Sequence, residues 1–181
     1  GPDREPPQPG DAVIVSGPVG DHGAAVLSKR EGLNLDSGAK SDCAPLTEVA
    51  QAVIDSAERV SFMRDLTRGG VATILNEAVG EDYGINLRED DLPVRPEVRS
   101  LCELLGVDAL YLACEGRLAA IVDAASAEAV RDAMRSVDIA EEAAIVGNVT
   151  SDYAGKVVAE TAWGTHRLLQ MLSGEQLPRI C

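Results

Sequence analysis

The sequence predicts a single α+β domain in which a mixed sheet is covered by helices. Short apolar runs typical of strands alternate with stretches of helical periodicity along nearly the whole chain, and this alternation favours helices packed on a sheet. The composition agrees: 45% of the residues are hydrophobic and only 3% are aromatic, so Ala, Val, Leu and Ile must build the core. With 181 residues, the chain is long enough for one well-buried domain and short for two.

Prolines and glycines mark the beginning of the chain. Residues 1–10 hold four prolines and two glycines, and we interpret them as a linker that enters a domain spanning residues 11–172. Residues 12–15 form a continuous apolar run, which predicts a buried strand. The segment Gly20-Asp21-His22-Gly23 then begins a short helix, with Asp21 as the expected N-cap.

The middle of the chain alternates between helix and strand. After a polar loop at 31–43, residues 46–57 repeat apolar positions at spacings of three and four, which predicts an amphipathic helix. A short strand at 60–63 leads into the turn at 65–70, and a second helical stripe follows over 71–79. This succession of strand, glycine-rich turn and helix is the most informative local pattern in the chain.

The second half of the chain continues the same alternation. Proline near the first turn and glycine after the last turn are common boundaries of a helix. The expected elements are, in order, a strand at 85–87, a helix from Pro96 to Gly106, an apolar segment at 108–112, a strand at 118–122, a helix over 130–137, closing strands at 143–149 and 156–159, and a last helix at 165–172. Residues 173–181 show no periodicity, so we expect a flexible tail.

The charge and hydropathy of the chain exclude two classes of partner. Thirty acidic residues against 16 basic ones give a formal net charge of −14, which would repel a nucleic-acid backbone. The chain has no apolar run near the ~20 residues that a membrane-spanning helix needs, and no signal peptide at its start. We therefore expect a cytoplasmic protein that binds neither nucleic acid nor a membrane.

The four cysteines do not have the spacing of a metal site. They stand at positions 43, 102, 114 and 181, without a Cys-x-x-Cys pair and with only two histidines in the chain, so no metal site is predicted. In a reducing cytosol we expect free thiols rather than disulfides. Cys102 and Cys114 lie among apolar residues and are expected to be small core residues.

Three short segments hold candidate site residues. The amide groups of Gly69 and Gly70, at the entry of a helix, can bind an anion such as phosphate, and Arg68 can add further donors. The alternative is that the two glycines only provide unusual dihedral angles. His22 is flanked by glycine and aspartate and can hold or relay a proton, or it is simply a surface or capping residue. Glu115 follows an apolar run, from which a carboxylate is easily desolvated and becomes base-like; a solvated turn residue is the more common case.

The last residue, Cys181, is the strongest candidate. It lies at the tip of the tail 173–181, whose final seven links can extend on the order of 23 Å. An arm of this length can carry a thiol into a neighbouring pocket and out again. The alternative is an accidental terminal cysteine.

Taken together, these segments make the chain resemble the HypE family of hydrogenase maturation factors, within the superfamily of aminoimidazole ribonucleotide synthetase and selenophosphate synthetase. The resemblance extends from about residue 11 to the end, and the terminal motif is what selects HypE. The matching segments are Gly20-Asp21-His22-Gly23, Asp65-Leu66-Thr67-Arg68-Gly69-Gly70, Cys102-Glu103-Leu104-Leu105-Gly106, Glu115-Gly116 and Pro178-Arg179-Ile180-Cys181.

The resemblance implies an ATP-dependent carbamoyl dehydratase. A carbamoyltransferase, HypF, would load a carbamoyl group onto Cys181, and dehydration with ATP and Mg would leave an S-cyano group. The cyanide would pass to iron on the HypC–HypD complex for the nickel–iron hydrogenase centre. Glu115 would act as the base, Arg68 with the amides of Gly69 and Gly70 would bind phosphate, and His22 would position the substrate. The full-length protein would be a homodimer.

Two departures from the family limit what the resemblance implies. The family usually has Asn before the Glu-Gly pair, where this chain has Cys114. Its N-terminal ATP-binding domain is also missing, so we expect the chain alone to be inactive. One alternative is a non-catalytic carrier or docking module that presents Cys181. Another is the C-terminal domain of a selenophosphate or aminoimidazole ribonucleotide synthetase relative.

Overall fold

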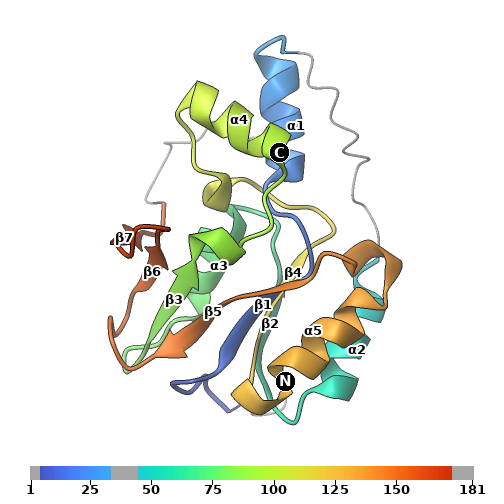
Figure 1. Cartoon of the computed structure of the whole chain (residues 1–181), viewed down its shortest axis with the longest axis vertical. Coiled ribbons are helices and arrows are strands. Elements are labelled where there is room, and N and C mark those ends of the chain that lie inside the picture. Colours follow the sequence, from blue (N-terminus) through green and yellow to red (C-terminus); the bar gives the residue numbers. More distant parts are fainter. Residues whose placement is uncertain (1–4, 34–44, 173–181) are drawn as a thin grey trace.

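The computed structural model describes residues 5–33 and 45–172 of the chain. Within them, one sheet of seven strands has the order β2-β4-β1-β5-β3-β6-β7 (Figure 1). All neighbouring strands are antiparallel except β3 and β6, which are parallel. The strands are β1 (Ala12–Val15), β2 (Val60–Asp65), β3 (Gly84–Arg88), β4 (Leu118–Val122), β5 (Ala144–Thr150), β6 (Val157–Glu160) and β7 (His166–Leu169).

Helices pack on the sheet and at one of its ends, so the expected α+β fold with a mixed sheet is confirmed. The α-helices are α1 (Asp21–Arg30), α2 (Thr47–Ser56), α3 (Gly70–Ala78), α4 (Pro96–Leu105) and α5 (Ala127–Arg135). Within the described residues, four short 3₁₀ helices lie between strands and α-helices: η1 (Glu89–Asp91), η2 (Ala109–Tyr111), η3 (Ala124–Ser126) and η4 (Asp138–Ala140).

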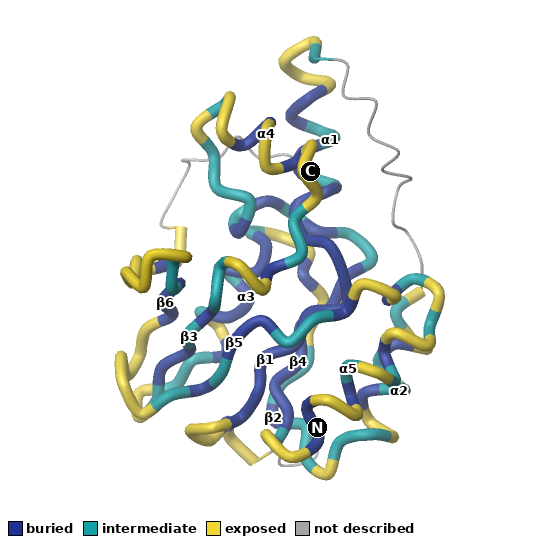
Figure 2. Tube along the Cα trace, in the orientation of Figure 1, coloured by how far each residue is buried: buried dark blue, intermediate teal, exposed yellow. Residues whose placement is uncertain are grey.

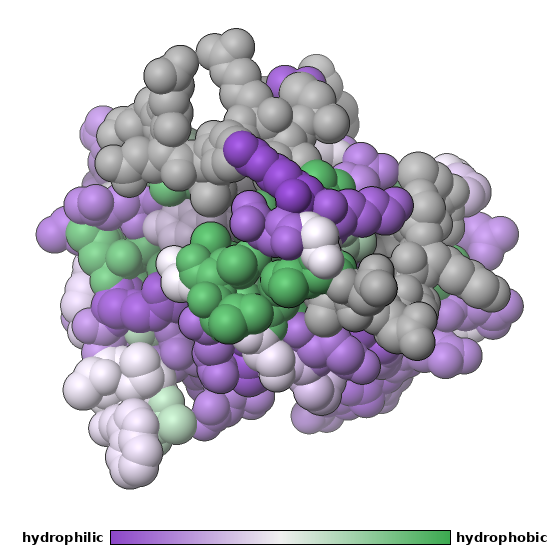
Figure 3. Space-filling model, turned by 90° about the horizontal axis from the view of Figure 1, so that it is seen from above, coloured by the Kyte–Doolittle hydropathy of each residue, from purple (hydrophilic) through white to green (hydrophobic). Residues whose placement is uncertain are grey.

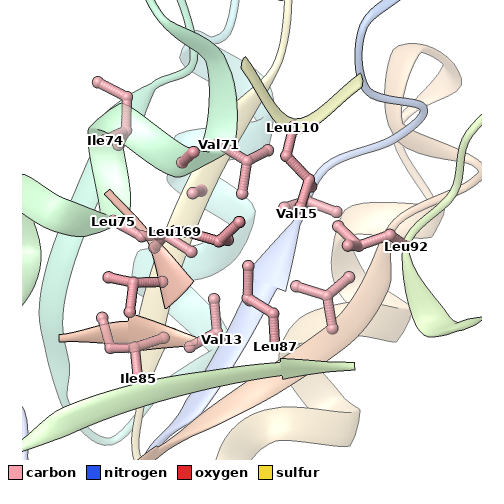
Figure 4. Close-up of a cluster of buried hydrophobic side chains, with 14 of the residues drawn as sticks. Val13, Val15, Val71, Ile74, Leu75, Ile85, Leu87, Leu92, Leu110 and Leu169 are labelled. Atoms are coloured by element: carbon pink, nitrogen blue, oxygen red, sulfur yellow. The ribbon is translucent and has the colours of Figure 1, made fainter. Parts of the chain in front are cut away.

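The central strand β1 shows how the sheet separates two apolar layers. All four of its residues are buried, and successive side chains of a strand point to opposite faces. Val13 and Val15 belong to the core cluster on the α3 side, which Figure 4 shows in close-up. Ile14 belongs to the cluster on the other face, which α2 and α5 cover. Burying one such side chain contributes about 1.5–3 kcal/mol.

A third apolar cluster lies beyond the sheet, between α1 and α4. It joins Ala24 and Leu27 of α1 to Val98 and Leu101 of α4, with Leu112 beneath them. Figure 1 shows these two helices together at one end of the molecule, away from α2 and α5. In Figure 2 the strands are mostly buried, while the outer sides of the helices are exposed.

The prediction of a last helix at 165–172 is wrong. Residues 166–169 instead form β7, which pairs antiparallel with β6 through Val157 and Leu169. A turn returns the chain alongside β6, where the Thr161 N–H donates to the Thr165 carbonyl at 2.8 Å. Leu169 is 1% exposed in the main core. Sheet pairing at this edge therefore overrides the leucine-rich pattern, which is too short to distinguish helix from strand.

The expected cap of the first helix is also wrong. The N-cap is Gly20, with a φ of 85°, and Asp21 is the first residue inside α1. Asp21 stabilises the first turn in a different way, because its carboxylate is buried and pairs with Arg95. The loop expected at 31–43 lies mostly outside the described residues, and so does the tail 173–181 with Cys181.

Candidate functional site

Three segments that are distant in sequence meet at the end of the sheet from which α1 begins. On one side, the Gly23 N–H at the start of α1 donates to the Ala113 carbonyl at 3.0 Å. On the other side, the Cys114 N–H donates to the carbonyl of Leu66, just after β2, at 2.9 Å. The segment 112–116 therefore lies between the start of α1 and the turn that leads into α3.

Glycines allow this close approach. A Cβ atom on Gly23 would lie 2.9 Å from the Leu112 Cβ. One on Gly70 would lie 2.5 Å from the Leu112 carbonyl oxygen, a distance that real Cβ atoms do not adopt. Gly70 also has a φ of 63°, in the left-handed region that favours glycine. Both motifs thus contain glycine where a side chain would separate the segments.

His22 and Glu115 face each other across this junction. The His22 Nε2 lies 3.8 Å from the Glu115 Oε1, and the two side chains are 32% and 42% exposed. The distance is longer than a direct hydrogen bond, but it allows an ion pair when His22 is protonated. Glu115 is held in a turn before β4, where Gly116 has a φ of 70°. The two predicted residues therefore lie together, and the exposure of Glu115 agrees with the solvated turn residue of the two alternatives.

An ion pair between a buried carboxylate and a half-exposed arginine supports the first turn of α1. The Asp21 side chain is 5% exposed, and its Oδ2 accepts a 2.9 Å hydrogen bond from the Arg95 Nε. Its other oxygen, Oδ1, is buried and has no hydrogen-bond partner among the described residues. Sequence reasoning missed Arg95, because a residue in the loop before α4 carries no periodic signal that would link it to α1.

The glycine-rich turn presents donors at the start of α3. Leu66 is fully buried, whereas Thr67 and Arg68 are exposed. Gly69 is the N-cap of α3, with a φ of 74°, and no side chain caps the first amides of the helix. Within the described residues no hydrogen bond or ion pair joins Arg68 to His22 or Glu115.

An unpaired hydroxyl marks the same helix start. The Thr73 Oγ1 is buried and has no hydrogen-bond partner among the residues that the structure describes. It lies beside Gly69, where an added Cβ would be 2.2 Å from it. The exposed guanidinium of Arg68 and the uncapped start of α3 suit an anionic phosphoryl group. Thr73 was not predicted from sequence, because it stands within the helical stripe.

The two described cysteines are core residues, as expected. Cys102 in α4 is 7% exposed, and burial raises the pKa of its thiol. Cys114 is 2% exposed, and its Sγ accepts a hydrogen bond from the Gly20 N–H at 3.2 Å. The same sulfur lies 3.4 Å from the Leu112 carbonyl oxygen, to which its S–H donates. Cys43 and Cys181 lie outside the described residues.

One cavity among the described residues is lined by none of the predicted site residues. A space of about 460 Å³ lies beside α4 and is lined by residues that include Leu92, Cys102, Leu110 and Arg167. Arg167 forms ion pairs with Glu89 and Asp108 at its edge. These carboxylates already hold the guanidinium of Arg167.

The surface at the α1–α4 end is partly apolar. Figure 3 views the molecule from this end and shows hydrophobic side chains gathered between hydrophilic ones. Leu104 of α4 is 70% exposed.

Among residues 5–33 and 45–172, no helix is long and apolar enough to cross a bilayer. The same residues contain no cluster of three His, Cys, Asp or Glu side chains suited to a metal ion.

Comparison with known proteins identifies the family. The profile of the family described as "AIR synthase related protein, C-terminal domain" matches residues 8–160. The chain belongs to this family. Over nearly its whole length it is similar to proteins named carbamoyl dehydratase HypE. That of Rhodobacter capsulatus is 49% identical over 175 residues, and that of Escherichia coli is 43% identical over 173.

The match covers only part of these relatives. It includes 96% of this chain but 52% of the Rhodobacter protein, and 95% of this chain but 51% of the Escherichia protein. The chain therefore spans about half the length of the curated relatives that it matches. The predicted resemblance to HypE is confirmed for this half.

Solved structures of HypE proteins have the same fold as this chain. A crystal structure of hydrogenase maturation protein HypE superposes with a TM-score of 0.90 at 44% identity and covers 99% of this chain and 59% of its own. A HypE complex with ATP gives 0.89 at 44% identity, covering 99% and 55%. A HypE–HypF complex gives 0.82 at 38% identity, covering 90% and 53%.

Proposed function

We propose that this chain is the C-terminal half of a HypE-type carbamoyl dehydratase, which converts an S-carbamoyl group on Cys181 into an S-cyano group with ATP. The observation that carries the proposal is the 3.8 Å approach of His22 to Glu115, where the three motif segments meet. The identity to carbamoyl dehydratases supports it. Because these relatives are about twice as long, the chain would act together with a segment that corresponds to their other half.

The reaction removes the elements of water from a thiocarboxamide. The oxygen of Cys181–S–C(=O)–NH₂ attacks the terminal phosphorus of ATP, which releases ADP, and the nitrogen loses one proton. Loss of the second N–H proton and cleavage of the C–O bond then release phosphate and leave Cys181–S–C≡N. The carbon keeps its oxidation state throughout, so no redox partner is needed. The chemistry requires a base near the nitrogen and donors near the phosphoryl oxygens.

The residues of the site can divide these tasks. We assign the removal of the proton to Glu115, whose carboxylate is accessible to an arriving tail because it is 42% exposed. His22 would hold the substrate from the opposite side, within reach of the same carboxylate. The turn amides at Gly69 and Gly70, with Arg68 and the hydroxyl of Thr73, would bind phosphoryl oxygens.

ATP binding by a relative supports the need for a nucleotide. A HypE at 44% identity has been crystallised in complex with ATP. When it is bound, ATP supplies the phosphoryl group that turns the substrate oxygen into a leaving group. We propose that Mg accompanies it, because a divalent cation neutralises charge on transferring phosphates. In this chain the residues at the start of α3 would hold the transferred end.

The proposed partners follow the same chemistry. A HypE at 38% identity forms a crystalline complex with HypF, and we propose HypF as the donor of the carbamoyl group. The HypC–HypD complex would receive the cyanide for the nickel–iron centre, and two copies of the full-length protein would form a homodimer. The cytoplasmic location stays a prediction.

Mass spectrometry of Cys181 tests the proposal. The full-length protein would be incubated with HypF, its carbamoyl donor system and ATP, and the C-terminal peptide would be followed in time. We expect a carbamoyl adduct on Cys181 that then loses the mass of one water. The variant Cys181→Ser should show neither adduct, whereas Cys102→Ser should behave as the wild type. Absence of any adduct on Cys181 would overturn the proposal.

Reconstitution separates a catalytic half from a carrier module. The alternative is a carrier module that presents Cys181 without dehydrating its adduct. Mixed with the separately produced other half, a catalytic half should restore the dehydrated adduct on Cys181. A carrier module would accept the carbamoyl group and bind its partner without dehydration.

A further inference from the structure

Cys114 joins the two sides of the site through its side chain. Its backbone N–H donates a hydrogen bond to the Leu66 carbonyl, which fixes the residue against the end of β2. Its sulfur accepts the N–H of Gly20, the N-cap of α1, at 3.2 Å. Glu115 follows Cys114 directly, and His22 follows Gly20 by two positions. The sulfur therefore links the segment that carries the carboxylate to the helix that carries the imidazole.

We propose that Cys114, as a reduced thiol, is a positioning residue that sets the approach of His22 to Glu115. The inference rests on the proposed function for its catalytic meaning, but its geometric claim concerns this chain alone. The thiol both accepts from Gly20 and donates to the Leu112 carbonyl at 3.4 Å. A side chain that only filled space would leave the Gly20 N–H without this acceptor.

A neighbouring bond provides an internal comparison. The Gly23 N–H donates to the Ala113 carbonyl at 3.0 Å, and this contact involves only backbone atoms. Substituting Cys114 by alanine removes the bond to Gly20 and retains the bond to Gly23. The first turn of α1 would then keep its attachments through Gly23 and through the Asp21–Arg95 ion pair, and would lose the one that precedes His22. His22, which lies between the two attachment points, would lose its fixed direction toward Glu115.

Amide exchange on the 181-residue chain tests the bond directly. The variants are Cys114→Ala, which removes the hydrogen-bond acceptor, and Cys114→Ser, which keeps an acceptor on a shorter side chain. Cys102→Ala is the matched control, because Cys102 is also a buried free thiol but belongs to the α1–α4 cluster. We expect exchange at the Gly20 amide to become at least about tenfold faster in Cys114→Ala, with Gly23 within about twofold and Cys114→Ser intermediate.

Imidazole chemical shifts test the consequence for the site. The chain has two histidines, and His166 lies 3.8 Å from Glu160, which makes it an internal reference. At one fixed pH, Glu115→Gln should change the ring shifts of His22 and leave those of His166 unchanged. In the Cys114→Ala background, Glu115→Gln should change the His22 ring shifts by less than half as much as it does in the wild-type background. In the Cys114→Ser background, part of the wild-type response should be recovered.

The outcomes separate this inference from the proposed function. If the Gly20 amide and the His22 response are the same in Cys114→Ala, Cys114→Ser and wild type, the positioning role is overturned. Should Cys114→Ala fail to fold, Cys114→Val, which fills the space without an acceptor, takes its place, and a wild-type response there overturns the role as well. Failure of the proposed function would appear elsewhere, as unchanged Cys181 chemistry in full-length protein that carries Glu115→Gln.

Discussion

The α2–α5 face of the sheet and the end of the sheet where the site lies are built by opposite means. On the α2–α5 face, large apolar side chains such as Val53 and Met134 fill the space and are fully buried. At the end of the sheet where the site lies, segments approach because side chains are absent at Gly23 and Gly70. The first arrangement tolerates changes of shape if volume is kept. The second tolerates no added atom, because backbone fills the space.

The most severe substitution should therefore be Gly70→Ala. An added Cβ would meet the Leu112 carbonyl oxygen at 2.5 Å, at a φ of 63°. We expect the free energy of unfolding to fall by about 4 kcal/mol or more, beyond the ~1–2 kcal/mol of left-handed strain alone. Urea denaturation measures this loss in the free energy of unfolding.

Gly106→Ala is the matched control for this substitution. Gly106 has a φ of 65°, but no atom lies within 4 Å of its added Cβ. It should lose only about 1–2 kcal/mol, because strain is its only cost. Equal losses at the two positions would show that close approach does not matter at the site.

A smaller loss is expected on the face that side chains fill. Met134→Ala leaves a cavity between α5 and the sheet and should lower the free energy of unfolding by about 2–4 kcal/mol. Met134→Leu, which keeps the volume, should lose less than about 1.5 kcal/mol. The His22 ring shifts should not change in either variant, as two-dimensional NMR would show. A shift of His22 would mean that the two regions are coupled.

A pH-dependent effect of about 1–2 kcal/mol is expected at the start of α5. Burial disfavours the charged form of Asp123, but hydrogen bonds from the Ser126 hydroxyl and from the Arg59 and Ser126 amides outweigh it and hold the pKa of this carboxyl below its usual value. Asp123→Ala should lose about 1–2 kcal/mol at pH 7 because these bonds are removed.

The sign of the pH dependence follows from the lowered pKa. The charged form contributes fully above the pKa of the unfolded chain, about 3.9, and this contribution is lost as the pH falls through the lower folded value. The difference between wild type and Asp123→Ala should therefore shrink below about pH 4 in urea titrations. A constant difference down to pH 2 would contradict the hydrogen-bond account.

The smallest effect on stability is expected at the site itself. Glu115→Gln keeps the shape of a side chain that is 42% exposed, and exposed ion pairs contribute about 0–1 kcal/mol. We expect a change of less than about 0.5 kcal/mol in urea denaturation. A loss above about 2 kcal/mol would mean that Glu115 is a structural residue.

The sequence predicted the elements whose signals are local. The stripe of α2, the Pro96–Gly106 boundaries of α4 and the apolar run of β4 were found because their periodicity or caps are contained within the segment. The strand β7 was missed because pairing with β6 decides it. At the site, His22 and Glu115 were identified as separate candidates, and the structure shows that they meet. Arg95 and Thr73 were missed because their roles depend on contacts with distant segments.

A single-turnover measurement on Cys181 tests the central claim most directly. Full-length protein is first carbamoylated, ATP is then added, and the mass of the C-terminal peptide is followed for wild type, Glu115→Gln and the exposed control Glu128→Gln. The account predicts that wild type and Glu128→Gln lose one water at the same rate, while Glu115→Gln keeps the carbamoyl group and reacts at least about 100-fold more slowly. Dehydration of Glu115→Gln at the wild-type rate would contradict it.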